Sequence, residues 1–171
     1  YMKNIAIIPA RIGSKRIPKK NIKNFLGSPI ISYPIKAALQ SNIFDEIIVS
    51  TDSLEILDLA QELGLDHFEL RPSALSDDHT PTAPVVEHAV RHLSKYDEKN
   101  ISSICCIYPT SVFVTSEILK DAYNKIRSSS NNRSCYSVLE NDSPILRSQR
   151  VNQDGFLEML WPEHELSRTQ D

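Results

Sequence analysis

Glycine is scarce in this sequence, with four residues in 171, and the glycine-rich nucleotide-binding motifs are absent. Gly13-Ser14-Lys15 has neither the first glycine nor the residue order of a Walker loop, GxxxxGK[ST]. The dinucleotide fingerprint GxGxxG is also missing. These absences argue against a P-loop NTPase and against a Rossmann dinucleotide-binding protein.

Cysteine is sparse too, and Cys105, Cys106 and Cys135 form no CxxC motif. Cys105 and Cys106 are adjacent in an apolar run, so on a strand they would face opposite sides. We interpret the three as reduced, buried thiols of a cytoplasmic protein, with a catalytic cysteine as the alternative. The five histidines show no metal-binding spacing. His88 and His92, four apart on a predicted helix, are expected at the surface.

Long hydrophobic runs and an excess of positive charge are also lacking. No apolar run approaches the ~20 residues of a membrane helix, and the N-terminus lacks a signal-peptide pattern. The net charge of −3 gives no general attraction to nucleic acid or to anionic membranes. We therefore expect neither as a partner, and any anion site must come from local clustering of charge.

Short β-like runs alternate with helical patterns through most of the chain. Strands are predicted at 3–9, 46–50, 66–70 and 101–108, and helices at 29–40, 54–63, 85–93 and 115–127. This alternation predicts an α/β three-layer sandwich with a mainly parallel, Rossmann-like sheet, in which 101–108 is a central strand. Pro34 should begin or kink its helix, since an interior proline costs ~3 kcal/mol. Asp52 and Glu55 predict a capping box.

The pattern changes after residue 132. Residues 133–139, 146–151 and 156–160 have strand-like sequences with no helix between them. The tail 161–171 has no capping glycine and no final core element. We expect residues 1–171 to be one domain that is incomplete at its C-terminus.

The strongest chemical signal is the basic loop after the first predicted strand, where open α/β sheets bind ligands. Within ten residues it carries Arg11, Lys15, Arg16, Lys19 and Lys20. Gly13 would let the backbone turn tightly toward a ligand, and Ser14 adds a hydroxyl donor. The loop suits a nucleoside triphosphate, which carries about four negative charges. A solvated basic turn is the alternative.

The pattern Ala-Arg-x-Gly-Ser-Lys-x-x-x-x-Lys-Asn at residues 10–21 resembles the first signature of the acylneuraminate cytidylyltransferases, the CMP-sialic acid synthetases. The resemblance continues in Ser50-Thr51-Asp52, Arg71-Pro72-x-x-Leu75-x-x-Asp78, Tyr108-Pro109-Thr110 and Trp161-Pro162-Glu163. Within that family the chain is most similar to the pseudaminic acid branch. The resemblance implies an enzyme that transfers CMP from CTP to a nine-carbon acidic sugar and releases pyrophosphate, for bacterial surface glycan or flagellin glycosylation.

The resemblance also implies roles for the residues that match. Arg11, Gly13, Ser14 and Lys15 would bind the CTP phosphates, and Lys20 would stabilise charge at the α-phosphate, with Arg11 and Lys15 assisting catalysis. The ribose would contact Asn21, while Arg71, Thr80 and Thr82 would face the nucleotide. Alternatively, Arg71 is a loop arginine that pairs with Asp77 or Asp78. Thr82 is alternatively the N-cap of a helix.

On the sugar side the resemblance points to Tyr108, Thr110, Arg168 and Gln170. Tyr108 replaces the glutamine typical of sialic acid synthetases, and this replacement favours pseudaminic acid as the substrate. Alternatively, Tyr108 is an aromatic side chain that covers the edge of the sheet. Mg²⁺ is the expected cofactor, with its protein ligands beyond Asp171. Residues 133–160 are expected to form an arm for homodimerisation or sugar binding. Two alternatives stay open: a legionaminic or N-acetylneuraminic acid substrate, and a truncated, non-catalytic CTP-binding module.

Overall fold

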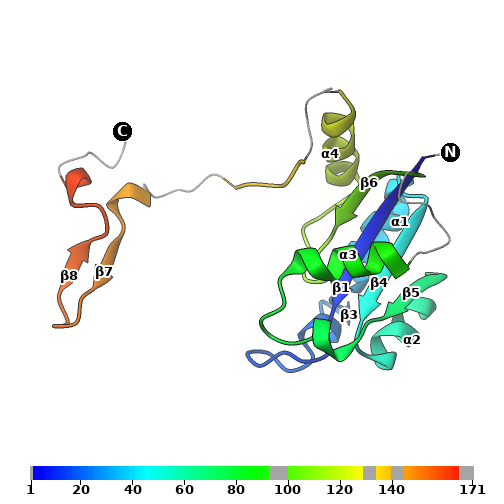
Figure 1. The fold of residues 1–171 in the computed structure, drawn as a ribbon, viewed down its shortest axis with the longest axis horizontal. Helices are drawn as coiled ribbons and strands as arrows, with labels where there is room; N and C mark the ends of the chain where they lie inside the picture. The colour runs from blue at the N-terminus through cyan, green and yellow to red at the C-terminus, as the bar shows by residue number, and fades with distance from the viewer. Residues whose placement is uncertain (1, 93–99, 129–133, 140–144, 166–171) are drawn as a thin grey trace. The chain divides into compact units, whose positions relative to one another are not determined.

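The computed structural model describes residues 2–92, 100–128, 134–139 and 145–165 (Figure 1). The chain divides into two compact units, Tyr1–Cys135 and Tyr136–Asp171, which are described separately. In the described part, no helix combines the length and the hydropathy that a membrane span needs.

A parallel sheet of four strands lies at the centre of the first unit. Its strands are β1 (Lys3–Ala10), β4 (Glu46–Thr51), β5 (His67–Leu70) and β6 (Ile101–Cys106), in the order β5-β4-β1-β6. The register of β1 on β4 runs from Ile5 opposite Glu46 to Ala10 opposite Thr51. The predicted parallel α/β sheet is confirmed. The prediction of a central strand at 101–108 is wrong for the described sheet, because β6 pairs with β1 alone and is its edge strand.

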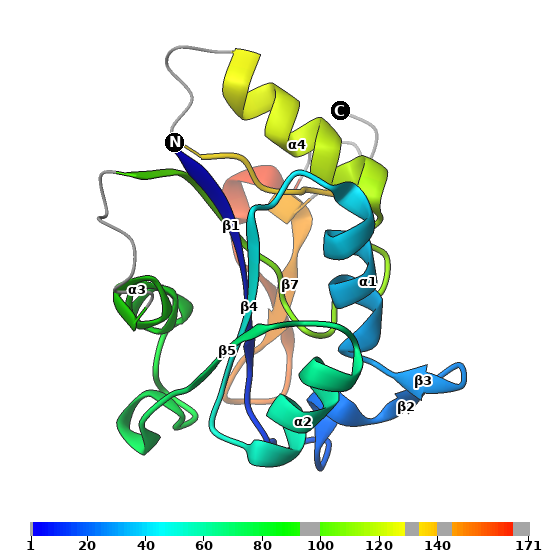
Figure 2. The ribbon, with the colours of Figure 1, turned by 90° about the vertical axis from the view of Figure 1, so that its right-hand side faces the viewer.

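Helices cover both faces of this sheet (Figure 2). The helices α1 (Ser32–Ser41), α2 (Leu54–Glu62) and α4 (Ser116–Ser128) lie on one face, and α3 (Thr82–His92) lies on the other. Side chains of β1 alternate between the two cores. Ala6 and Ile8 pack with α1, α2 and α4, whereas Ile5 and Ile7 pack with α3. Each fully buried isoleucine contributes about 1.5–3 kcal/mol, so β1 firmly anchors the basic loop that follows it.

The ends of the helices follow from local sequence in most cases. Pro34 lies in the first turn of α1, where its missing N–H has no intrahelical partner to lose. Thr115 caps α4 by accepting a hydrogen bond from the Ile118 amide at 3.3 Å. Past the end of α2, Gly64 has a φ of 88°, which favours glycine.

The predicted capping box at Asp52 and Glu55 is wrong. Ser53 precedes α2 and makes no side-chain cap. The Asp52 Oδ1 atom instead accepts a hydrogen bond from the Ile12 amide at 2.9 Å, and Glu55 pairs with Lys19 at 2.7 Å. Asp52 therefore holds the backbone of the basic loop after β1, whereas the ion pair between Glu55 and Lys19 is exposed and contributes little.

The cysteines are free thiols, but two of the three are exposed, which corrects the prediction of burial. Cys106 and Cys135 are exposed, while Cys105 is half-buried. Burial raises the pKa of the Cys105 thiol to about 11. Because the thiolate is the nucleophile, this pKa argues against catalysis by Cys105.

Short elements complete the first unit. They are the two-stranded ribbon β2 (Asn24–Phe25) and β3 (Ser28–Pro29), and the 3₁₀ turns η1 (Lys20–Ile22) and η2 (Ser73–Leu75).

The second unit contains an antiparallel hairpin of β7 (Gln149–Val151) and β8 (Leu157–Met159). Its turn is organised by the Asn152 Oδ1 atom, which accepts hydrogen bonds from the Asp154 and Phe156 amides. The 3₁₀ turns η4 (Ile145–Arg147) and η5 (Pro162–His164) flank it. Residues 134–139 form no strand, so that prediction is wrong for its described part; no described strand pairs with them. Arg133 lies outside the described residues.

Candidate nucleotide-binding site

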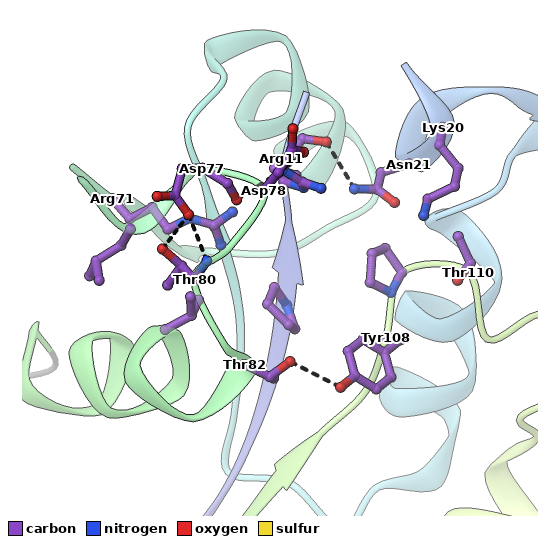
Figure 3. Close-up of a pocket in the computed structure, with 14 residues that line it drawn as sticks. Arg11, Lys20, Asn21, Arg71, Asp77, Asp78, Thr80, Thr82, Tyr108 and Thr110 are labelled. Carbon is purple, nitrogen blue, oxygen red and sulfur yellow. Dashed lines mark hydrogen bonds and ion pairs between the residues drawn. The ribbon is translucent and has the colours of Figure 1, made fainter. Parts of the chain in front are cut away.

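Three loops meet at the carboxyl edge of the sheet and surround a cavity of about 190 Å³ (Figure 3). The loop after β1 supplies Arg11, Lys20 and Asn21, and the loop after β6 supplies Tyr108 and Thr110. The segment after β5 supplies Arg71, Asp77, Asp78, Thr80 and Thr82. We call this space the strand-end cavity. Its position is the one at which open α/β sheets bind ligands.

Lys20 brings a positive charge to the strand-end cavity without a counter-ion. It opens the turn η1 directly after Lys19, whose φ of 49° places that residue in the left-handed region. Among the residues that the structure describes, no carboxylate pairs with the Lys20 ammonium group. The site therefore attracts an anion at this point.

Asn21 has a structural role beside Lys20. Its side chain is buried, and Nδ2 donates a hydrogen bond to the Arg11 carbonyl at 2.9 Å. The side-chain oxygen takes no part in that bond, so the predicted contact with the ribose stays a prediction.

Arg71 is a buried cation, 6% exposed, at the inner wall of the cavity. Its Nε donates to the Ser76 Oγ at 3.0 Å, and its Nη1 donates to the Ser50 carbonyl at 3.1 Å. Desolvation lowers the pKa of Arg71, and the charges of Asp52 and Glu69 oppose that effect. The alternative in which Arg71 pairs with Asp77 or Asp78 is wrong, because the guanidinium is held by Ser50 and Ser76.

Thr80 and Thr82 both line the cavity and are held by different partners. The Thr80 hydroxyl donates to the Asp77 Oδ1 at 2.6 Å. The Thr82 hydroxyl lies 3.0 Å from the Tyr108 hydroxyl, which joins the start of α3 to the end of β6 (Figure 3). Thr82 is the first helical residue of α3 and not the N-cap residue before it. Its hydroxyl bonds to Tyr108 instead.

A second space of about 430 Å³, the loop cavity, lies against the basic loop. It is lined by Arg11, Gly13, Ser14 and Lys15, and by residues 76–79 of the segment after β5. Arg11 and Asp78 line both cavities. The structure therefore brings the predicted phosphate-binding residues together around one space.

Not every feature of the basic loop behaves as predicted. Gly13 is not among the positive-φ glycines, and a Cβ there would meet nothing within 4 Å, so its backbone requires no glycine. Gly13 nevertheless lines the loop cavity. Lys19 pairs with Glu55, and Arg16 lines neither cavity.

The described residues do not fit a metal site of their own. No group of three or more histidine, cysteine, aspartate or glutamate side chains within them is able to hold an ion. Asp77 and Asp78 are already bonded, to Thr80 and to the loop cations respectively. Arg168 and Gln170, the predicted sugar contacts, lie outside the described residues.

Sequence reasoning missed two features near the site. Asp78 bridges Arg11 and Lys15, whereas the sequence suggested Arg71 as its partner. His88, expected at the surface, has its Nδ1 paired with the Glu69 carboxylate, which is 2% exposed on β5. A buried carboxylate is costly unless it is paired, which explains why the His88 ring turns toward the sheet.

A lysine with no carboxylate partner among the described residues, a buried arginine and a cationic loop lie together at the carboxyl edge of a parallel sheet, an arrangement suited to an anionic ligand such as a nucleotide. Comparison with known proteins gives the family. The cytidylyltransferase family profile matches residues 5–154, and the chain belongs to that family of nucleotidyltransferases.

Individual relatives agree with the family assignment. The chain is 40% identical over 170 residues to a pseudaminic acid cytidylyltransferase of Campylobacter jejuni, covering 99% of this chain and 72% of that protein. It is 39% identical over 123 residues to a CMP-N,N'-diacetyllegionaminic acid synthase of Legionella pneumophila, covering 71% of this chain and 52% of that protein.

A solved structure supports the fold. A CMP:2-keto-3-deoxy-manno-octonic acid synthetase, solved in complex with CTP, superimposes with a TM-score of 0.62 at 21% identity. The match covers 75% of this chain and 49% of that structure, so the chain spans about half the length of that neighbour.

Proposed function

We propose that this chain transfers CMP from CTP to pseudaminic acid, a nine-carbon acidic sugar, and releases pyrophosphate. The family assignment and the Campylobacter jejuni relative support the reaction. The structural observation that carries the proposal is Lys20, an ammonium group that faces the strand-end cavity with no carboxylate partner in the described chain.

The reaction requires charge stabilisation rather than covalent catalysis by the protein. The anomeric hydroxyl oxygen of the sugar forms a bond to the α-phosphorus, the bond from that phosphorus to the bridging oxygen breaks, and pyrophosphate leaves with the electron pair. The hydroxyl proton is released. Lys20 would offset the charge that grows on the α-phosphate oxygens, assisted by Arg11 in the same cavity and by Lys15 in the loop cavity.

The two cavities suggest how the nucleotide is divided between them. The β- and γ-phosphates would occupy the loop cavity, where Arg11, Lys15 and the Ser14 hydroxyl offer donors. The nucleoside would occupy the strand-end cavity against Arg71, Thr80 and Thr82. The proton of Thr80 is already used by Asp77, so Thr80 would act toward the nucleotide as an acceptor.

The sugar site is a proposal resting on Tyr108 and Thr110, together with Arg168 and Gln170. Tyr108 and Thr110 line the strand-end cavity on the side of β6. A legionaminic acid substrate is the second candidate, because of the Legionella pneumophila relative.

Calorimetry with CTP, followed by pyrophosphate release with a panel of sugars, tests the function. We expect CTP to bind more tightly than ATP or GTP, and pseudaminic acid to support faster release than legionaminic or N-acetylneuraminic acid. Equal binding of the three nucleotides contradicts the cytidine assignment. CTP binding without turnover on any sugar favours a non-catalytic binding module.

Dependence on Mg²⁺, a homodimer and a cytoplasmic location stay predictions. Removal of divalent ions by a chelator should abolish pyrophosphate release, and light scattering at several concentrations should report a dimer. A strict monomer contradicts the proposed pairing arm at residues 133–160.

A further inference from the structure

Asp78 sits between the two cations that line the loop cavity. Its Oδ1 accepts a hydrogen bond from the Arg11 Nη1 at 2.6 Å, and its Oδ2 lies 2.6 Å from the Lys15 Nζ. One carboxylate therefore bridges two positive groups from another loop, 67 residues away along the chain from Arg11. Its side chain is 27% exposed, so solvent and ligands reach it.

The neighbouring carboxylate has a different function. The Asp77 Oδ1 accepts hydrogen bonds from the His79 amide at 2.9 Å and from the Thr80 amide at 2.6 Å, so it folds its own loop. Only the Asp77 backbone carbonyl reaches Arg11, at 2.9 Å. Asp78 has no comparable bond within its loop among the described residues, and its oxygens are used on the cations.

We propose that Asp78 is an internal counter-anion of the phosphate site, which a polyphosphate ligand must displace; this inference rests on the proposed function. The carboxylate occupies the Arg11 Nη1 and the Lys15 Nζ, and a phosphate would compete for them because carboxylates and phosphates accept the same charge-assisted hydrogen bonds. Both Arg11 contacts to this segment come from Nη1.

The bridge makes Asp78 a residue that selects for chain length in the phosphate group. The two cations are held by separate oxygens of one carboxylate. A ligand that displaces Asp78 from both cations must therefore place one oxygen at Arg11 and another at Lys15. A triphosphate does so with oxygens to spare, whereas a nucleoside without phosphate does not compete with Asp78. Asp78 also repels any phosphate that binds beside it, since like charges in one site oppose each other.

The test compares Asp78→Asn with a matched control, Glu55→Gln. Glu55 pairs with Lys19 of the same basic loop at 2.7 Å, and neither residue lines either cavity. Both variants lose one negative charge beside the loop, but only the first removes the charge that bridges the phosphate-site cations. Inorganic tripolyphosphate, CTP and cytidine are titrated into each protein by calorimetry at low and high salt, with melting temperatures as a check on folding.

We expect Asp78→Asn to bind tripolyphosphate and CTP about three- to tenfold more tightly than the wild type at low salt, the range for releasing two exposed ion pairs. The gain should shrink as salt screens the charges, cytidine affinity should not change, and Glu55→Gln should match the wild type. An Asp78→Asn protein that binds tripolyphosphate equally or more weakly overturns the inference alone. A wild-type chain that binds neither CTP nor tripolyphosphate overturns the proposed function and this inference together.

Discussion

Replacing Asp52 by alanine should loosen the basic loop after β1, because it removes the acceptor that holds the Ile12 amide at 2.9 Å. A hydrogen bond to a charged acceptor contributes about 1.5–3 kcal/mol, and partial exposure lowers this to about 1–2 kcal/mol. For a chain of this size, each 1 kcal/mol corresponds to roughly 2–4 °C in melting temperature, so we expect a decrease of about 2–8 °C. A less ordered loop should also weaken CTP binding by about three- to tenfold.

The assay pairs thermal unfolding with CTP calorimetry, and Asp52→Asn is the control. Asparagine keeps an oxygen acceptor for the Ile12 amide but loses the charge, so it should recover more than half of the lost stability and affinity. If Asp52→Ala matches the wild type in both measurements, the loop is held by other contacts and the reasoning is wrong. If Asp52→Asn is as impaired as alanine, charge rather than the hydrogen bond is the cause.

Three further predictions concern the site itself. Lys20→Ala should lower the rate of pyrophosphate release by about a hundredfold or more while CTP affinity changes less than about threefold, because the lysine acts on the developing charge. Replacement of the exposed Lys23 by alanine is the control. Normal turnover in the Lys20 variant removes Lys20 from the mechanism. Thr82→Val and Tyr108→Phe each break the same 3.0 Å hydrogen bond, so the double variant should bind CTP no more weakly than the worse single variant, and additive losses would contradict a shared bond. The pKa of Asp77 is lowered chiefly by the side-chain hydrogen bond with Thr80 in its own loop. The Asp77 carboxylate therefore stabilises the fold above the ordinary aspartate pKa of about 4, and this contribution is lost as the pH falls through the lowered pKa. The melting-temperature difference between wild type and Asp77→Ala should therefore disappear in acid, and a difference that persists at the lowest pH contradicts this assignment.

Local sequence was sufficient for most of the secondary structure. The isoleucine-rich run of β1 has too few polar residues to face water, so it predicts a strand buried on both faces, and Ile5 and Ile8 are fully buried. Pro34 and Gly64 act through their own backbone preferences, which need no distant partner. The prediction failed at 134–139, because a strand requires a neighbour whose position the local sequence does not contain.

The site was predicted as a set of residues and not as a network. The basic composition of the loop and its family signature identify Arg11, Lys15 and Lys20 as anion-binding residues, since charge and spacing are written in consecutive positions. The bond from Asp78 to Arg11 joins residues 67 apart, and the bond from Asp52 to Ile12 joins residues 40 apart.

The sequence by itself determined the alternating architecture, the family and the type of charge at the strand end, because each depends on residue type and short-range order. Only the tertiary structure decided which carboxylates meet those cations, that Glu69 is buried against His88, and that Lys20 faces a cavity unpaired within the described chain. The physical reason is that the order of the parallel strands chooses which loops become neighbours, and charges interact according to distance in space.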